Sequence, residues 1–110
     1  MTMQLQVDEQ IRRTIQVKIP GRLDIVSAPE VKEQLERYLA EGVTDFVIDL
    51  SETPFMDSAG LAVLVSLLRR CRNQGGTVKL VWPRSEHVQR TLTLTRFDQV
   101  FDIIGRESAG

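Results

Sequence analysis

The chain has 110 residues, of which 42% are hydrophobic and 26% charged, and its formal net charge is −1. Such values are typical of one globular domain and exclude a disordered or fibrous protein. The longest unbroken apolar run, residues 61–65, is far shorter than a membrane span, so we expect no membrane insertion. A lone cysteine and a lone histidine exclude an intrachain disulfide and disfavour a metal site, so we expect a cytoplasmic protein without cofactors.

An alternating stretch marks the first clear strand. Residues 15–19 alternate between apolar and polar side chains, which is typical of a half-buried strand, and Pro20 ends it. Residues 3–7 are expected to pair with this strand through a turn at residues 8–10.

Helical spacing begins after Ser27. A capping box is expected there, with Ser27 as the N-cap and Glu30 three residues further on. Apolar residues then follow at helical spacing until Gly42 ends the helix. Residues 45–50 form an apolar run of strand length, expected to be a buried, parallel strand.

The second half continues the alternation. It is expected to add a helix from near Ser58 to the glycines at 75–76, a strand at 78–82, a helix after Ser85 and a short strand at 100–104. The order β-β-α-β-α-β-α-β predicts a single α/β domain whose parallel strands are joined by right-handed crossovers. We expect its core to span about residues 5–104, with a frayed polar tail at residues 105–110.

The junction of the buried strand and the second helix is the best candidate for a site, because function in α/β sheets collects beyond the carboxyl ends of strands. Asp57 and Ser58 stand there, followed by the small residues Ala59 and Gly60. A serine at this point can cap the helix. Alternatively its hydroxyl is left accessible, and a phosphate there would face the helix dipole. Both interpretations fit the residues.

A catalytic role for Ser58 is disfavoured, because a nucleophilic serine needs a base. The lone histidine, His87, lies near the start of a later helix and is expected to be a solvated surface residue. No G-x-S-x-G elbow occurs, and lysines are scarce. We therefore do not expect an enzyme.

The second helix is unusually apolar, since Ser66 is its one polar residue between positions 59 and 68. One stripe suffices to face a sheet, and Ala62, Val63 and Leu67 fall at its edges or beyond it. Either the helix is deeply buried or these residues form an exposed patch for a partner.

The densest basic cluster, residues 69–72, lies in the last turns of the same helix, where cations complement the helix dipole. A nucleic-acid binder concentrates far more positive charge on one face. We therefore expect no direct binding to nucleic acid.

Several motifs in order resemble the STAS domain, the module shared by sulphate transporters and anti-sigma factor antagonists. They are Gly21-Arg22-Leu23-Asp24, Ala28-Pro29-Glu30, Val47-Ile48-Asp49-Leu50-Ser51, Phe55-Met56-Asp57-Ser58-Ala59-Gly60-Leu61, Gly75-Gly76-Thr77 and Phe97-Asp98-Gln99-Val100-Phe101. The Asp-Ser-x-Gly-Leu stretch is the most specific of them. A chain of this size resembles the bacterial anti-sigma factor antagonists.

The resemblance implies a small mixed sheet flanked by helices and a switch built on Ser58. The unmodified form would bind an anti-sigma factor that is also a serine kinase, and so free a sigma factor. The kinase would phosphorylate Ser58 and end the binding, and a serine phosphatase would reset the switch. Together with the apolar helix, the resemblance predicts a docking surface that comprises Asp24, Asp57, Ser58, Ala59, Gly60, Ala62, Val63 and Leu67. Replacing Asp24 by lysine is expected to weaken binding without disturbing the fold.

Two positions depart from the common pattern. Ala59 stands where many members have a second serine, which leaves Ser58 as the hydroxyl of the motif, and Arg96 stands where many have glycine. An alternative within the same fold is a non-phosphorylated accessory subunit of a membrane transporter, of the lipid-transport ATPase type.

Overall fold

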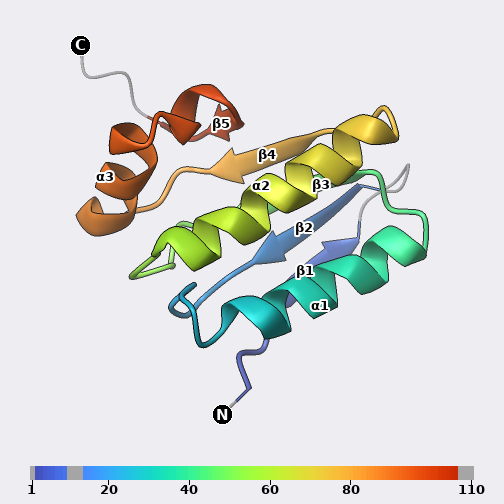
Figure 1. Cartoon of the computed structure of the whole chain (residues 1–110), viewed down its shortest axis with the longest axis horizontal. Helices are drawn as coiled ribbons and strands as arrows, with labels where there is room; N and C mark the ends of the chain where they lie inside the picture. Colours follow the sequence, from blue (N-terminus) through green and yellow to red (C-terminus); the bar gives the residue numbers. More distant parts are fainter. Residues whose placement is uncertain (1, 10–13, 107–110) are drawn as a thin grey trace.

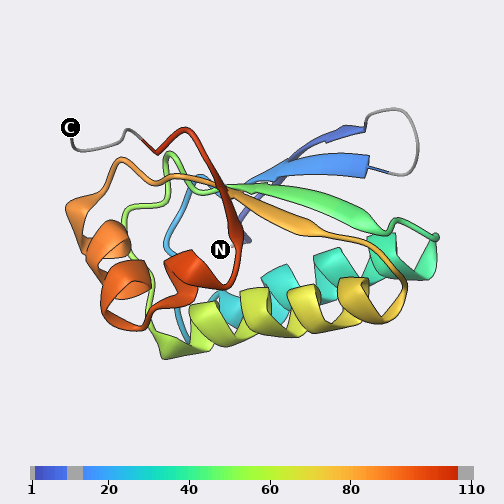
Figure 2. The same ribbon diagram turned by 90° about the horizontal axis from the view of Figure 1, so that it is seen from above.

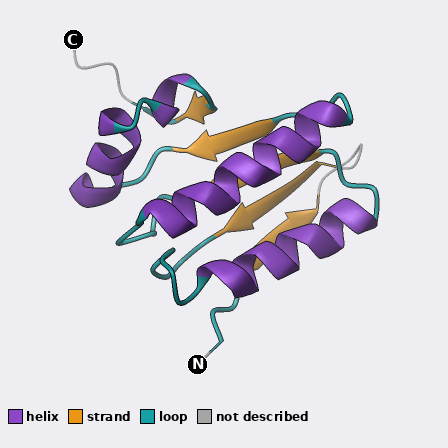
Figure 3. Ribbon diagram, viewed as in Figure 1, coloured by secondary structure: helices purple, strands orange, loops and turns teal. Residues whose placement is uncertain are grey.

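The computed structural model describes residues 2–9 and 14–106 (Figure 1). Its elements are β1 (Gln6–Glu9), β2 (Thr14–Lys18), α1 (Ala28–Ala40), β3 (Asp45–Asp49), α2 (Ser58–Asn73), β4 (Val78–Val81), α3 (Glu86–Leu94), the 3-10 helix η1 (Phe97–Gln99) and β5 (Asp102–Ile104). The predicted order of strands and helices is confirmed, and η1 is an addition to it (Figure 3).

The sheet has the order β1-β2-β3-β4-β5, so each strand pairs with its neighbours in sequence. β1 is antiparallel to β2, and the pairs from β2 to β5 are parallel. Residues 8 and 9, expected in a turn, belong to β1, while residue 10 lies outside the described residues. The fold is therefore a single α/β domain with a mixed sheet.

Both long helices lie on one face of the sheet, and no described helix covers the other face (Figure 2). This arrangement explains the alternation in β2, where Ile15 and Val17 are buried and the three residues that alternate with them are half-buried. In β3, Phe46 and Ile48 point into the core, whereas Val47 is half-buried on the open side. The run at 45–50 is thus parallel as expected but is covered on one face.

The expected capping box at the start of α1 is wrong. The Ser27 side chain caps no helical amide, and its Oγ instead donates to the Arg22 carbonyl at 2.6 Å. Glycines end the helices as expected, because Gly42 and Gly75 take the left-handed conformation with φ of 95° and 77°.

Residue 106, expected to lie in a frayed tail, contacts the domain instead. The Arg106 guanidinium pairs with Asp98 at 2.8 Å and lies 4.3 Å from the centre of the Trp82 ring. Arg106 therefore packs against the domain, and residues 107–110 lie outside the described residues.

Candidate functional site

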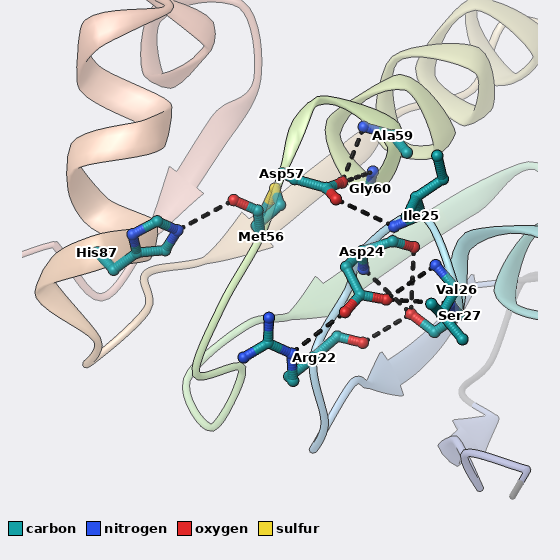
Figure 4. Close-up of polar contacts among 10 residues, drawn as sticks. All are labelled: Arg22, Asp24, Ile25, Val26, Ser27, Met56, Asp57, Ala59, Gly60 and His87. Carbon is teal, nitrogen blue, oxygen red and sulfur yellow. Dashed lines mark hydrogen bonds and ion pairs between the residues drawn. The ribbon is translucent and has the colours of Figure 1, made fainter.

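The candidate site lies where the carboxyl ends of β2 and β3 meet, as parallel neighbours require (Figure 4). The loops that follow these strands pair with each other. Leu23 donates its N–H to the Phe55 carbonyl at 2.9 Å, and Asp57 donates its N–H to the Leu23 carbonyl at 3.3 Å. Two segments more than 30 residues apart in sequence are thereby fixed side by side at the start of α2.

Asp57, rather than Ser58, is the N-cap of α2. One carboxylate oxygen of Asp57 accepts the N–H groups of Ala59 at 2.9 Å and Gly60 at 3.1 Å. The other accepts the N–H of Ile25 at 3.0 Å, which ties the β2–α1 loop to the helix. A carboxylate at this position is also favoured by the positive end of the helix dipole.

Ser58 is consequently the first helical residue, and its side chain is exposed. The capping interpretation is wrong for this serine, because Asp57 already binds the amides that a cap would use. No residue in the described part of the chain hydrogen-bonds the Ser58 hydroxyl. The structure thus presents an exposed hydroxyl without a hydrogen bond in the first turn of α2.

Asp24 lies in the β2–α1 loop, near Asp57, and its carboxylate holds the loop together. One of its carboxylate oxygens accepts the N–H groups of Val26 at 3.0 Å and Ser27 at 3.1 Å, and the other accepts the Arg22 Nε at 3.2 Å. Its side chain is 15% exposed. These contacts predict that Asp24→Lys disturbs the loop, contrary to the expectation from the sequence, because that change removes the acceptor of all three hydrogen bonds.

The Asp24 carboxyl should make stability depend on pH. The Ser27 amide, together with the Arg22 guanidinium, holds the pKa of Asp24 below its ordinary value of 3.8. A carboxyl with a lowered folded pKa stabilises the protein above its unfolded pKa, and that stabilisation is lost as pH falls through the folded pKa. Between about pH 5 and pH 2.5, urea unfolding of Asp24→Asn should therefore depend less on pH than that of the wild type. Equal slopes would contradict this.

Gly60 leaves room for the close approach of the Leu23 backbone in the β2–α1 loop. A Cβ at this position would lie 2.2 Å from the Leu23 carbonyl oxygen. Gly60 is buried, which argues against its predicted direct contact with a partner, whereas Ala59 is half-buried at the edge of the site.

Of the two alternatives for the apolar residues of α2, deep burial is confirmed for Val63 and Leu67, and their predicted exposure is wrong. Val63 is 7% exposed and Leu67 is 3% exposed, because both pack in the core beneath the helix. Ala62 is exposed. The extra apolar residues of α2 therefore serve mainly to bury the helix.

The exposed apolar side chains of the site come instead from the β2–α1 loop. Ile25 is 73% exposed and Val26 is 83% exposed, directly beside Asp24. A groove of about 430 Å³ leads from Ile25 along Ala59 and Ala62 between α1 and α2. Two adjacent β-branched apolar residues inside a turn, where polar residues prevail, were the available signal in the sequence.

Within residues 2–9 and 14–106, no group of three or more histidine, cysteine or acidic side chains is arranged to hold a metal ion. No described helix is both long and apolar enough to cross a membrane.

The fold and this site define a STAS domain. The STAS domain family model matches residues 3–109, and the chain belongs to that family. The anti-sigma-B factor antagonist of Bacillus subtilis (strain 168) is 37% identical over 109 residues, which cover 98% of each chain. That of Listeria monocytogenes is 31% identical over 94% of this chain and 90% of its own. A solved anti-sigma factor antagonist from Mycobacterium paratuberculosis gives a TM-score of 0.81 at 25% identity, covering 96% of this chain and 87% of its own.

Proposed function

We propose that this protein is an anti-sigma factor antagonist whose unmodified form binds an anti-sigma factor and so releases a sigma factor. Its full-length similarity to anti-sigma-B factor antagonists supports this class. It does not favour the alternative of a transporter subunit. We place the switch at Ser58, and the observation that carries this is its exposed, unbonded hydroxyl beside the Asp57 cap.

In this scheme the anti-sigma factor is also a serine kinase and supplies the catalytic groups. The Ser58 Oγ attacks the γ-phosphorus of ATP, ADP leaves, and the hydroxyl proton passes to a base of the kinase. A serine phosphatase later hydrolyses the phosphate ester. The antagonist itself acts as a binding protein in the bacterial cytoplasm, and its contribution is to hold the acceptor hydroxyl in place.

The first test is the site of modification. After incubation with an anti-sigma serine kinase and ATP, mass spectrometry should place one phosphate on Ser58, and Ser58→Ala should accept none. Arrival of the phosphate at Ser51, Ser66 or Ser85, with Ser58 unmodified, would refute the assignment.

The β2–α1 loop should be the apolar part of the docking surface, because Ile25 and Val26 lie exposed beside the acceptor. Val26→Lys should weaken binding to the anti-sigma factor at least tenfold, since a cation would have to be desolvated where an apolar side chain was buried. Leu94→Lys is the matched control, because Leu94 is 76% exposed but lies at the end of α3. Calorimetry that finds equal losses for the two variants would remove the loop from the docking surface.

A further inference from the structure

The acceptor loop, residues 54–57 before Ser58, is also held by contacts on the side opposite to the β2–α1 loop. The start of α3 provides the contacts. Ser85 Oγ donates to the Pro54 carbonyl at 3.0 Å. His87 Nε2 lies 3.2 Å from the Met56 carbonyl (Figure 4). A carbonyl oxygen accepts hydrogen bonds and does not donate them, so Nε2 carries the proton in this contact.

The His87 ring makes a second contact with the same loop. It stacks on Phe55 with a centroid distance of 4.5 Å and an interplanar angle of 8°. The Arg22 guanidinium carbon lies over the same ring, 4.1 Å from its centroid. Since the imidazole covers one face of Phe55, the guanidinium occupies the other. His87 is therefore more than the solvated surface residue that the sequence suggested, although its side chain is exposed.

These contacts converge on one peptide group. The Met56 carbonyl and the Asp57 N–H belong to the same planar unit. His87 binds its oxygen at 3.2 Å, and the Leu23 carbonyl accepts from its nitrogen at 3.3 Å. Two bonds from opposite sides fix the orientation of this plane. The orientation of this peptide plane helps to set the positions of the Asp57 side chain and of the Ser58 hydroxyl, which follow it in the chain.

We propose that His87 is a positioning residue for Ser58. Through its contacts with the Met56 carbonyl and the Phe55 ring, it holds the acceptor loop in the conformation in which the kinase phosphorylates Ser58. The proposal rests on the proposed function, because it concerns the same hydroxyl. Without His87, the one hydrogen bond that the described residues still make to this peptide group is the Leu23 contact, which is long for an N–H to O bond. The peptide group then turns more freely and the hydroxyl samples unproductive positions.

The test compares the wild type with His87→Ala, His87→Gln and Arg90→Ala. Glutamine places an amide donor near the position of Nε2, which restores the Met56 contact without the ring. Arg90 is an exposed residue of the same helix whose side chain has no hydrogen bond or ion pair within the described part of the chain. Amide exchange at Asp57 and kcat/KM for phosphorylation of Ser58 are measured for each, with melting temperature as the control for the fold.

In His87→Ala, the Asp57 amide should exchange about five- to tenfold faster, the loss expected for one hydrogen bond. Its phosphorylation kcat/KM should fall on the order of tenfold. His87→Gln should recover most of both losses, and Arg90→Ala should show neither. Nitrogen NMR should find the proton of the neutral His87 ring on Nε2.

Unchanged exchange at Asp57 in His87→Ala, no recovery in His87→Gln, or a proton on Nδ1 would each overturn the proposal without reference to any kinase. Faster exchange with unchanged kcat/KM would also overturn it, because the loop would then move without consequence for the acceptor. Failure of the wild type to accept phosphate would instead refute the proposed function, and the exchange data would still decide whether His87 positions the loop.

Discussion

Phosphorylation of Ser58 is expected to weaken binding to the anti-sigma factor about a hundredfold or more, which corresponds to roughly 3 kcal/mol. The phosphate adds about −1.5 to −2 charges at pH 7. It would lie beside the Asp57 carboxylate, which already holds the amides of Ala59 and Gly60. The phosphate therefore cannot replace its lost hydration with those amides when a partner covers the site. Desolvation and like-charge repulsion both oppose the complex.

The fold itself should tolerate the modification. Ser58 is exposed at the positive end of α2, where an added anion is favoured by roughly 0.3–1 kcal/mol. Repulsion from Asp57 offsets part of that gain in a solvent-exposed setting. Circular dichroism and the melting temperature should therefore change little between the two forms. A large spectral change would contradict a switch that works through surface electrostatics.

Two substitutions separate charge from the loss of the hydroxyl. Ser58→Ala should bind persistently in the presence of kinase and ATP, because it has no acceptor. Ser58→Asp should bind less well than the alanine variant but better than the phosphorylated protein, since it carries one charge on a shorter side chain. Calorimetry that gives equal affinities for alanine, aspartate and phosphoserine at this position would refute the electrostatic mechanism.

Gly60→Ala is expected to lower the free energy of unfolding by about 2–3 kcal/mol, or on the order of 10 °C in melting temperature. The added Cβ would lie 2.2 Å from the Leu23 carbonyl oxygen and 2.7 Å from its side chain. Alanine gains about 1 kcal/mol of helix propensity over glycine. The collision outweighs that gain, because relieving it moves the Leu23 backbone and breaks its hydrogen bonds to Phe55 and Asp57.

Gly21→Ala is the matched control for this prediction. Its Cβ would come no closer than 3.1 Å, to the sulfur of Met3, which is a flexible side chain. Thermal unfolding should thus distinguish the two alanines clearly. If Gly60→Ala were as stable as Gly21→Ala, the predicted collision between residue 60 and the Leu23 backbone would be refuted.

The order of elements could be predicted because each element carries its own local signal. Alternation marks β2, an apolar run marks β3, and glycines mark the helix ends. The capping box failed because Ser27 sits in a turn organised by Asp24, whose carboxylate binds the Ser27 amide from three residues earlier. In a capping box the Glu30 side chain would accept from the Ser27 amide, which Asp24 binds instead. Which of the two carboxylates binds this amide depends on how the loop closes.

The position of Ser58 at the start of a helix could also be predicted, but not that Asp57 caps the helix and leaves the Ser58 hydroxyl unbonded. Either residue suits an N-cap, and the choice is made by the Ile25 amide, which lies 32 residues away and binds the second carboxylate oxygen of Asp57. Burial of Val63 and Leu67 was one of two alternatives that the sequence left open, because helical spacing defines a face but not how deeply α1 encloses it. The stack on Phe55 joins three separate segments and leaves no local pattern.

Release of a sigma factor from a preformed complex with its anti-sigma factor tests the proposed antagonism most directly. The complex is titrated with unmodified protein or with protein phosphorylated at Ser58, and free sigma factor is measured by size-exclusion chromatography. Unmodified protein should displace the sigma factor at stoichiometric concentrations, and the phosphorylated form should require on the order of a hundredfold more. Equal displacement by both forms, or none by the unmodified protein, would contradict the proposed switch.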